Sequence, residues 1–250
     1  MEFKIESEHQ KQRRGFLVKS LSSLVVIYVI PNILGKSLAA KPPSEKVSSQ
    51  TKWGMHIDVE KCVDGCSACV EACKDENGLY GFGRPETDSQ WIRKIKLRDL
   101  NTNKISVLPM LCQHCENPPC CDVCPTEASF KREDGIVMVN QHTCIGCRYC
   151  MMACPYKARS FVHENLTEQL PHAPRGKGCV ESCTMCVHKI DAGIETTACA
   201  EACKSDGHQA IIFGDLKDPK SAISLRLKKF GATQIRSDLN LNTGVRYQGI

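Results

Sequence analysis

One cysteine-rich run constrains the fold of this chain more than any other stretch. Residues 144–155 read Cys-Ile-Gly-Cys-Arg-Tyr-Cys-Met-Met-Ala-Cys-Pro, with the spacing C-x2-C-x2-C-x3-C-P. Three cysteines in one loop can bind three irons of a single cubane, and the fourth, on the following helix, points to a neighbouring cluster. Structural zinc sites instead take two cysteines from each of two knuckles. The run therefore favours [4Fe-4S] clusters over zinc.

The pattern recurs three more times with altered spacing. The first motif is C-x3-C-x2-C-x3-C, the second C-x2-C-x4-C-x3-C-P, and the fourth, after the run above, C-x2-C-x12-C-x3-C. The motif cysteines are Cys62, Cys66, Cys69 and Cys73; Cys112, Cys115, Cys120 and Cys124; Cys144, Cys147, Cys150 and Cys154; and Cys183, Cys186, Cys199 and Cys203. They are sixteen of the eighteen cysteines, and they predict four [4Fe-4S] clusters. Cys121 and Cys179 are left over, and we expect them to be buried thiols outside the ligand sets.

The composition agrees with a fold held together by metal. Only 6% of the 250 residues are aromatic and the mean hydropathy is −0.28, so a large apolar core is not expected. Clusters that each tie down four side chains can replace part of such a core. The net charge of +5 does not indicate nucleic-acid binding. Residues 1–40 account for +3 of it (six basic, three acidic), and four oxidised clusters at roughly −2 each bring the remainder from +2 to about −6.

The N-terminal segment has the features of an export signal. Arg13-Arg14 is followed by Phe16-Leu17, by a mostly apolar stretch over 21–34, and by small residues at 37–39. Twin arginines before an apolar run are typical of Tat signals, so we expect residues 1–40 to be a Tat signal segment. A membrane anchor is the alternative. However, the apolar run of about fourteen residues contains Pro31 and is shorter than the roughly twenty residues that a bilayer requires.

The cysteines and the export signal support each other. Tat substrates cross the membrane folded, which suits a protein whose clusters are inserted in the cytoplasm. Eighteen thiols threaded unfolded into an oxidising compartment would instead form disulfides. A disulfide framework is therefore disfavoured against the cluster interpretation.

Short elements fill the sequence between the motifs. Alternating or β-rich runs predict strands at 55–59, 90–97, 104–108, 136–139, 159–163 and 209–213. Asn101-Thr-Asn103 and Asp134-Gly135 predict hairpin turns. Asp218-Pro219 predicts the start of a helix that ends at Gly231. Residues 41–52 are expected to be a polar linker, and the last twenty residues an extended tail.

Four such motifs behind a twin-arginine signal resemble the four-cluster ferredoxin-type subunits of complex iron–sulfur oxidoreductases. This family serves dimethyl sulfoxide, polysulfide, tetrathionate and formate-dependent nitrite reductase systems, and the resemblance covers residues 53–216. Residues 147–163 and the ending Asn-Thr-Gly-Val-Arg-Tyr-Gln-Gly-Ile at 242–250 look like the DsrO-type subunits of this family. Those are periplasmic iron–sulfur subunits of the membrane complex linked to dissimilatory sulfite reductase.

The resemblance implies a fold and a division of the chain. The fold would be α+β, with two nested bacterial dicluster-ferredoxin-like units, few short helices and hairpins, and a large loop content. The outer unit would comprise residues 53–111 and 175–215, and the inner unit residues 112–165. Residues 216–250 would form a C-terminal helix and an extended partner-binding tail.

The resemblance also implies which cysteines share a cluster, by pairing the first motif with the fourth and the second with the third. The implied sets are Cys62, Cys66, Cys69 and Cys203; Cys73, Cys183, Cys186 and Cys199; Cys112, Cys115, Cys120 and Cys154; and Cys124, Cys144, Cys147 and Cys150. Three features depart from the family pattern. The first motif has an additional residue among 63–65, Lys204 replaces the usual proline, and Cys121 adjoins the ligand Cys120.

The expected function is electron transfer without substrate chemistry. Four clusters at ferredoxin spacing make a relay for single electrons. The resemblance implies a quinone-interacting membrane subunit of the NrfD type and a multihaem cytochrome c as partners. It places the protein in the periplasm, peripheral on the outer face of the cytoplasmic membrane. The chain has no C-x-x-C-H, so any haem belongs to a partner.

Two other functions are alternatives to this one. The chain could be the relay subunit of a molybdopterin reductase of the tetrathionate, polysulfide or dimethyl sulfoxide type, or serve a nitrite reductase system. An enzyme that uses a cluster as Lewis acid would need an open iron position, and cysteine fills all sixteen ligand positions. The histidines considered, His114, His142, His163 and His188, are expected to be polar residues without a ligand role. The cations near the motifs, Lys131, Arg148, Lys157 and Arg159, could raise the potentials of nearby clusters, but we expect them at the solvated surface.

Overall fold

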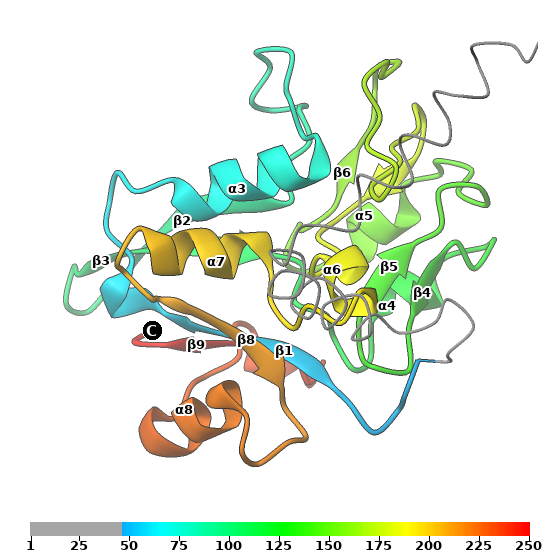
Figure 1. The fold of residues 1–250 in the computed structure, drawn as a ribbon. Helices are drawn as coiled ribbons and strands as arrows, with labels where there is room; N and C mark the ends of the chain where they lie inside the picture. The colour runs from blue at the N-terminus through cyan, green and yellow to red at the C-terminus, as the bar shows by residue number, and fades with distance from the viewer. Residues whose placement is uncertain (1–46) are drawn as a thin grey trace, which may run out of the picture. The chain divides into compact units, whose positions relative to one another are not determined.

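The central strand of the main sheet is β1 (Trp53–Asp58), in a computed structural model that describes residues 47–250. All six of its residues are buried, and both of its edges pair with strands from the far end of the chain. β8 (Ile211–Asp215) runs antiparallel to β1, and β9 (Val245–Gln248) runs parallel to it (Figure 1). The strands expected before the first motif and after the fourth are therefore both present. The export segment predicted at 1–40 lies outside the described residues.

The C-terminal residues contain a strand instead of an extended tail. Val245 and Tyr247 are fully buried, and the Tyr247 hydroxyl donates a hydrogen bond to the carbonyl oxygen of Pro109 at 3.1 Å. The sequence predicts only an extended tail here, because the four residues of β9 are too few to show a periodicity. The strand forms because the edge of β1 that does not pair with β8 offers backbone N–H and C=O groups as hydrogen-bond partners.

A hairpin leads into the second motif as expected. β2 (Ile92–Arg98) and β3 (Ile105–Leu111) pair antiparallel along seven residues each. The side chain of Asp99 accepts hydrogen bonds from the backbone nitrogens of Asn101 and Thr102, which stabilises the turn. The buried end of β3 delivers the chain directly to Cys112.

Two helices from opposite ends of the described sequence pack side by side. They are α3 (Ala68–Asn77) and α7 (Ala198–Ser205) (Figure 1). α3 ends at Gly78, whose φ of +62° favours glycine, and the Thr197 side chain caps α7 by accepting from the nitrogen of Ala200. Each helix carries two motif cysteines four residues apart, so each pair lies on one helix face.

The middle of the chain forms smaller elements. α4 (Pro119–Asp122) packs against α5 (Tyr149–Ala153), and β4 (Ser129–Lys131) pairs antiparallel with β5 (Val137–Val139). The predicted two-residue turn is a longer loop here, closed by a hydrogen bond from the nitrogen of Arg132 to the carbonyl oxygen of Ile136. β6 (Ser160–Phe161) pairs with β7 (Val180–Glu181), and α6 (Val187–Asp191) follows.

The helix after β8 begins later than predicted. α8 (Ala222–Phe230) is capped by the Ser221 side chain, which accepts from the nitrogen of Ser224, and it stops at Gly231 as expected. Asp218 and Pro219 precede the helix in a turn instead of starting it, because Ser221 satisfies the free N–H groups of the first turn. Short 3₁₀ turns, η1 (Val59–Lys61) and η2 (Ser237–Leu239), complete the elements of the described residues.

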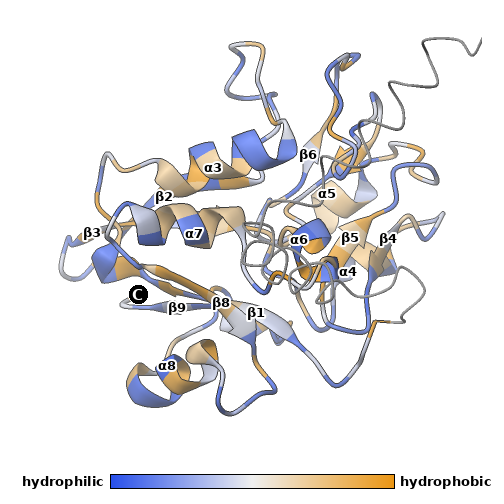
Figure 2. Ribbon diagram, viewed as in Figure 1, coloured by the Kyte–Doolittle hydropathy of each residue, from blue (hydrophilic) through white to orange (hydrophobic). Residues whose placement is uncertain are grey.

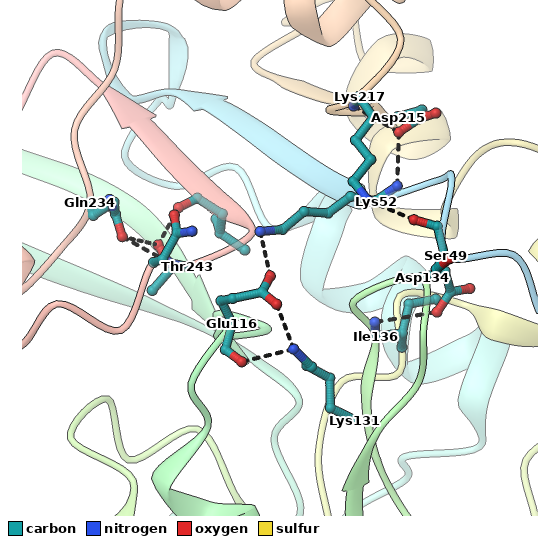
Figure 3. Close-up of polar contacts among 12 residues, drawn as sticks. Ser49, Lys52, Glu116, Lys131, Asp134, Ile136, Asp215, Lys217, Gln234 and Thr243 are labelled. Carbon is teal, nitrogen blue, oxygen red and sulfur yellow. Dashed lines mark hydrogen bonds and ion pairs between the residues drawn. The ribbon is translucent and has the colours of Figure 1, made fainter.

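Charged contacts join the start of β1 to the second motif. Glu116 forms ion pairs with Lys52 and Lys131 (Figure 3). Nζ of Lys131 also donates a hydrogen bond to the backbone carbonyl oxygen of Glu116 at 2.9 Å. The nitrogen of Trp53 donates to the carbonyl oxygen of Asp134. Figure 2 shows apolar colouring along β8 and mixed colouring on α3 and α8, as expected for helices that cover a sheet. Motif cysteines form part of the buried core. The predicted α+β class with short elements and much loop is confirmed.

Candidate metal centres

We refer to each of the four predicted ligand sets as a tetrad, and the first contains Cys62, Cys66, Cys69 and Cys203. α3 and α7 position Cys69 and Cys203, while Cys62 follows η1. Burial raises the pKa of the Cys62 thiol to about 12, and the nearby thiols of Cys69 and Cys203 add to the shift. The additional residue in the first motif therefore does not keep Cys62 away from its set. The nitrogen of Ala210 donates to the Cys203 sulfur at 3.2 Å.

The second tetrad comprises Cys73, Cys183, Cys186 and Cys199, all of them buried. They line one hollow, together with Met55 and Trp91. The backbone nitrogens of Met185 and Ala198 lie 3.4 and 3.5 Å from the sulfurs of Cys183 and Cys186. Hydrogen bonds to sulfur stabilise thiolates and raise the potential of a bound cluster.

The third tetrad comprises Cys112, Cys115, Cys120 and Cys154, which are also all buried. Burial raises the pKa values of the Cys112 and Cys115 thiols to about 12. Cys120 differs, because a hydrogen bond with Cys121 and the guanidinium of Arg159 lower its pKa. Nη2 of Arg159 lies 3.1 Å from the Cys120 sulfur. The expectation that Arg159 is a solvated surface residue is wrong, since only 6% of it is exposed.

The fourth tetrad comprises Cys124, Cys144, Cys147 and Cys150, which line one hollow. Cys147 is exposed. Backbone nitrogens of Ser129 and Val180 donate to the sulfurs of Cys124 and Cys144 at 3.3 and 3.5 Å. Burial raises the pKa of Cys124, but hydrogen bonds from Ser129 and Thr126 outweigh it and hold that pKa below its ordinary value.

A glycine allows the loop of the fourth tetrad to close. Gly146 lies between Cys144 and Cys147 and has a φ of +70°. A Cβ at this position would lie 2.2 Å from the carbonyl oxygen of Gly178, a backbone atom that cannot move independently. The loop thus needs glycine both for its backbone conformation and for its approach to the segment before β7.

Thiols of the first and second tetrads, and likewise of the third and fourth, lie within electrostatic reach of one another. Burial raises the pKa of Cys199 to about 12, and Cys69 of the first tetrad is among the thiols that add to the shift. Burial likewise raises the pKa of Cys150, with a contribution from Cys120 of the third tetrad. Tyr247 lies near thiols of the first and second tetrads and contacts the residue that follows Cys112 of the third. Burial raises its pKa, with contributions from Cys62 and Cys183, and its hydroxyl accepts from Nε2 of Gln113, beside Cys112, at 3.0 Å.

The donor set of each tetrad fits an iron–sulfur cluster. Thiolates bind iron in such clusters, and the backbone N–H groups directed at the sulfurs would compensate their negative charge. Nε and Nη1 of Arg159 are buried donors without a protein partner, and sulfur acceptors between the third and fourth tetrads would satisfy them. Because burial raises most of the thiol pKa values, cluster assembly must release protons.

The two leftover cysteines and the histidines have other contacts. The Cys179 sulfur donates to the carbonyl oxygen of Gln141 at 3.3 Å, and the Cys121 sulfur lies 3.6 Å from the Ser129 hydroxyl. His114 is fully buried. Its Nδ1 accepts from the nitrogen of Val137, and burial, aided by Arg159, lowers its pKa to about 3. His188 pairs with Glu76 at 2.6 Å.

Comparison with known proteins places the chain among iron–sulfur subunits. Residues 103–215 match the family model described as a 4Fe-4S dicluster domain. The chain is 40% identical to the Hdr-like menaquinol oxidoreductase iron-sulfur subunit 1 of Archaeoglobus fulgidus, over 94% of the chain and 97% of the relative. It is 39% identical to a subunit of the tetrathionate reductase of Salmonella typhimurium, over 74% and 67%. It is 34% identical to the menaquinone reductase iron-sulfur cluster-binding subunit of Nitratidesulfovibrio vulgaris, over 78% and 88%.

Proposed function

Because the chain belongs to the family of four-cluster [4Fe-4S] ferredoxin-type subunits of iron–sulfur oxidoreductase complexes, we propose that its four tetrads each hold one cluster and together form an electron relay. The coarse role follows from the family: an electron-transfer subunit of a membrane-associated oxidoreductase complex with four [4Fe-4S] clusters. The assignment of ligands to individual clusters is our proposal. It comprises the four tetrads defined above, with the nested outer and inner units expected from the sequence.

The burial of the tetrads carries this proposal. All four cysteines of the second and of the third tetrad are buried, whereas three cysteines of the first tetrad are half-buried and Cys147 of the fourth is exposed. This arrangement suits a relay, because electrons can enter and leave at the more exposed centres while the buried centres are shielded from water. The influence of Cys69 on Cys199 supports a first tetrad next to the second, and that of Cys120 on Cys150 supports a third next to the fourth.

The chain's own residues hold and shield the centres. Bound clusters would supply one-electron chemistry. Backbone N–H groups and the Arg159 guanidinium hold negative charge on the sulfurs of Cys120, Cys124, Cys144 and Cys203. Trp91 and Met55 line the second tetrad and exclude water from it.

The surface around Cys147 suits a partner subunit. Ile145, Tyr149 and Met152 are large apolar side chains with 68%, 54% and 65% of their surface exposed. They flank the exposed cysteine of the fourth tetrad in sequence and on α5. A group of exposed apolar residues beside a redox centre is typical of a protein–protein contact that excludes water. We place one site of electron exchange here.

Partners and location are proposed from the relatives and the signal motif. We propose a quinone-interacting membrane subunit of the NrfD type and a multihaem cytochrome c, in a periplasmic, Tat-exported complex of sulfur metabolism. The relative that matches 94% of the chain is named as a subunit of a menaquinol oxidoreductase, which supports a quinone-linked partner. None of the helices in residues 47–250 is long and apolar enough to span a membrane. The alternative, a molybdopterin reductase, is supported by the 39% identity to a tetrathionate reductase subunit.

Metal analysis tests the relay. Anaerobically purified protein is expected to contain about sixteen iron and sixteen acid-labile sulfide per chain. Zinc without sulfide would contradict the proposal. Isolation of the native complex, with haem and molybdenum analysis of its subunits, distinguishes the two sets of partners. Haem without molybdenum supports the cytochrome c and membrane subunit, and molybdenum supports the molybdopterin reductase.

A further inference from the structure

Arg159 is a buried cation without a carboxylate partner among the described residues. Its exposed fraction is 6%, and the ion pairs of residues 47–250 include none to it. An isolated charge in such a place is costly unless other groups compensate it. The compensation comes from thiols: burial lowers the pKa of Arg159, but the neighbouring Cys120, Cys112 and Cys150 more than reverse this and raise it.

The guanidinium lies between two tetrads. Nη2 donates to the Cys120 sulfur of the third tetrad at 3.1 Å and to the Ser129 hydroxyl at 2.7 Å. Ser129 also links the two tetrads, because its backbone nitrogen donates to the sulfur of Cys124. Nε and Nη1 have no partner within the described protein.

We propose that Arg159 is a positioning residue that raises the reduction potentials of both clusters it lies between, those of the third and fourth tetrads. This inference rests on the proposed ligand sets. Reduction adds a negative charge to a cluster, and a fixed guanidinium in a region of low dielectric stabilises that charge. The planar guanidinium has five N–H donors and can donate hydrogen bonds to sulfurs on two sides at once. The compact ammonium group of lysine cannot do this.

The test is a redox titration followed by EPR on the anaerobic holoprotein. Arg159→Gln keeps a similar shape and removes the charge. We expect the reduction equilibrium of each of the two clusters to become about tenfold less favourable. For a one-electron couple, this lowers each midpoint potential by about 59 mV. Serine variants of Cys154 and Cys124 assign the two signals to the third and fourth tetrads. Arg98→Gln is the control, because Arg98 is exposed at the end of β2 and its charge is screened by solvent.

Iron and sulfide content is measured first, so that failure of the relay proposal is recognised separately. If Arg159→Gln retains four clusters and neither potential moves beyond the shift in the control, the inference is overturned. If that variant loses a cluster, Arg159→Lys decides. With four clusters present, the lysine variant is expected to show a lowered potential at one or both of the two centres. Unchanged potentials at both would overturn the inference.

Discussion

At the scale of single residues, two neighbouring cysteines of the third motif are assigned to different clusters. Cys150 and Cys154 are four residues apart, with Cys150 on α5 and Cys154 at its C-terminal end, yet they lie in different tetrads. The helix directs Cys150 back to its own loop, while the turn after it carries Cys154 toward Cys112 and Cys115. In the proposed assignment, these two close neighbours in sequence bind two separate clusters.

A serine substitution at Cys154 tests this division. We expect Cys154→Ser to alter or remove the cluster of the third tetrad and to leave that of the fourth intact, because a serine hydroxyl is a poorer iron ligand than a thiolate. EPR and Mössbauer spectroscopy of the reduced protein give the measurement. Cys150→Ser is the matched control and should affect the fourth tetrad instead. Loss of the fourth centre in Cys154→Ser would refute the proposed pairing.

At the scale of elements, a buried ion pair fastens the loop over 164–178. Nε and Nη2 of Arg175 contact the two carboxylate oxygens of Glu181 in β7 at 2.9 and 2.8 Å. Nη1 of Arg175 also donates to the carbonyl oxygen of Gly78, at the end of α3. The side chains of the pair are 6% and 1% exposed. One arginine therefore connects the helix of the first motif to the strand that precedes the fourth.

Removing one partner of this pair is expected to be strongly destabilising. Arg175→Met leaves the carboxylate of Glu181 buried without a counter-charge, at a cost of about 3–5 kcal/mol. The measurement is the temperature at which the cluster absorbance is lost under anaerobic heating. The double variant Arg175→Met, Glu181→Leu should recover part of the loss, because it leaves no unpaired charge.

The exposed pair of Arg84 and Glu164 is the control for this prediction. Its side chains are 46% and 41% exposed, and its atoms lie 2.8 Å apart. Arg84→Met should change stability by about 0–1 kcal/mol. If Arg175→Met behaved like this control, the connection through Arg175 would not contribute to the stability of the fold.

At the scale of the whole molecule, assembly must precede transport in the proposed pathway. The sixteen motif cysteines come from segments spread over residues 62–203, so the tetrads exist only in the folded chain. An export channel that takes unfolded chains could not pass a protein whose clusters are already in place. Arg13 and Arg14 are the residues that would direct the folded protein to the Tat route.

Replacing both arginines by lysine tests this route. We expect Arg13→Lys, Arg14→Lys to leave a folded, cluster-containing protein in the cytoplasm, because residues 1–52 contain no cysteine. Cell fractionation, with iron–sulfur absorbance of the retained protein, gives the measurement. Normal amounts of the variant in the periplasm would exclude Tat dependence. The apolar stretch over 21–34 would then be better explained as an anchor inserted by another route.

The sequence by itself determined the cofactor chemistry and the general fold. Cysteine spacing within each motif is a local property, because three thiols must reach one cubane from a single loop, and such spacing is visible in the chain. The hairpin before Cys112 and the strand before Cys62 were predictable for a similar reason, since β2, β3 and β1 each show a clear alternating or apolar pattern.

Only the tertiary structure decided the placement of β9 and of Arg159. Val245 and Tyr247 belong to four residues without a recognisable period, and they form a strand because β1 offers an edge nearly two hundred residues away in sequence. Arg159 is charged, and its sequence context predicts a position at the surface. It is buried because α4, α5 and the start of β4 close around it, and the thiols of two tetrads compensate its charge. Burial of this kind depends on long-range packing, which no local pattern records.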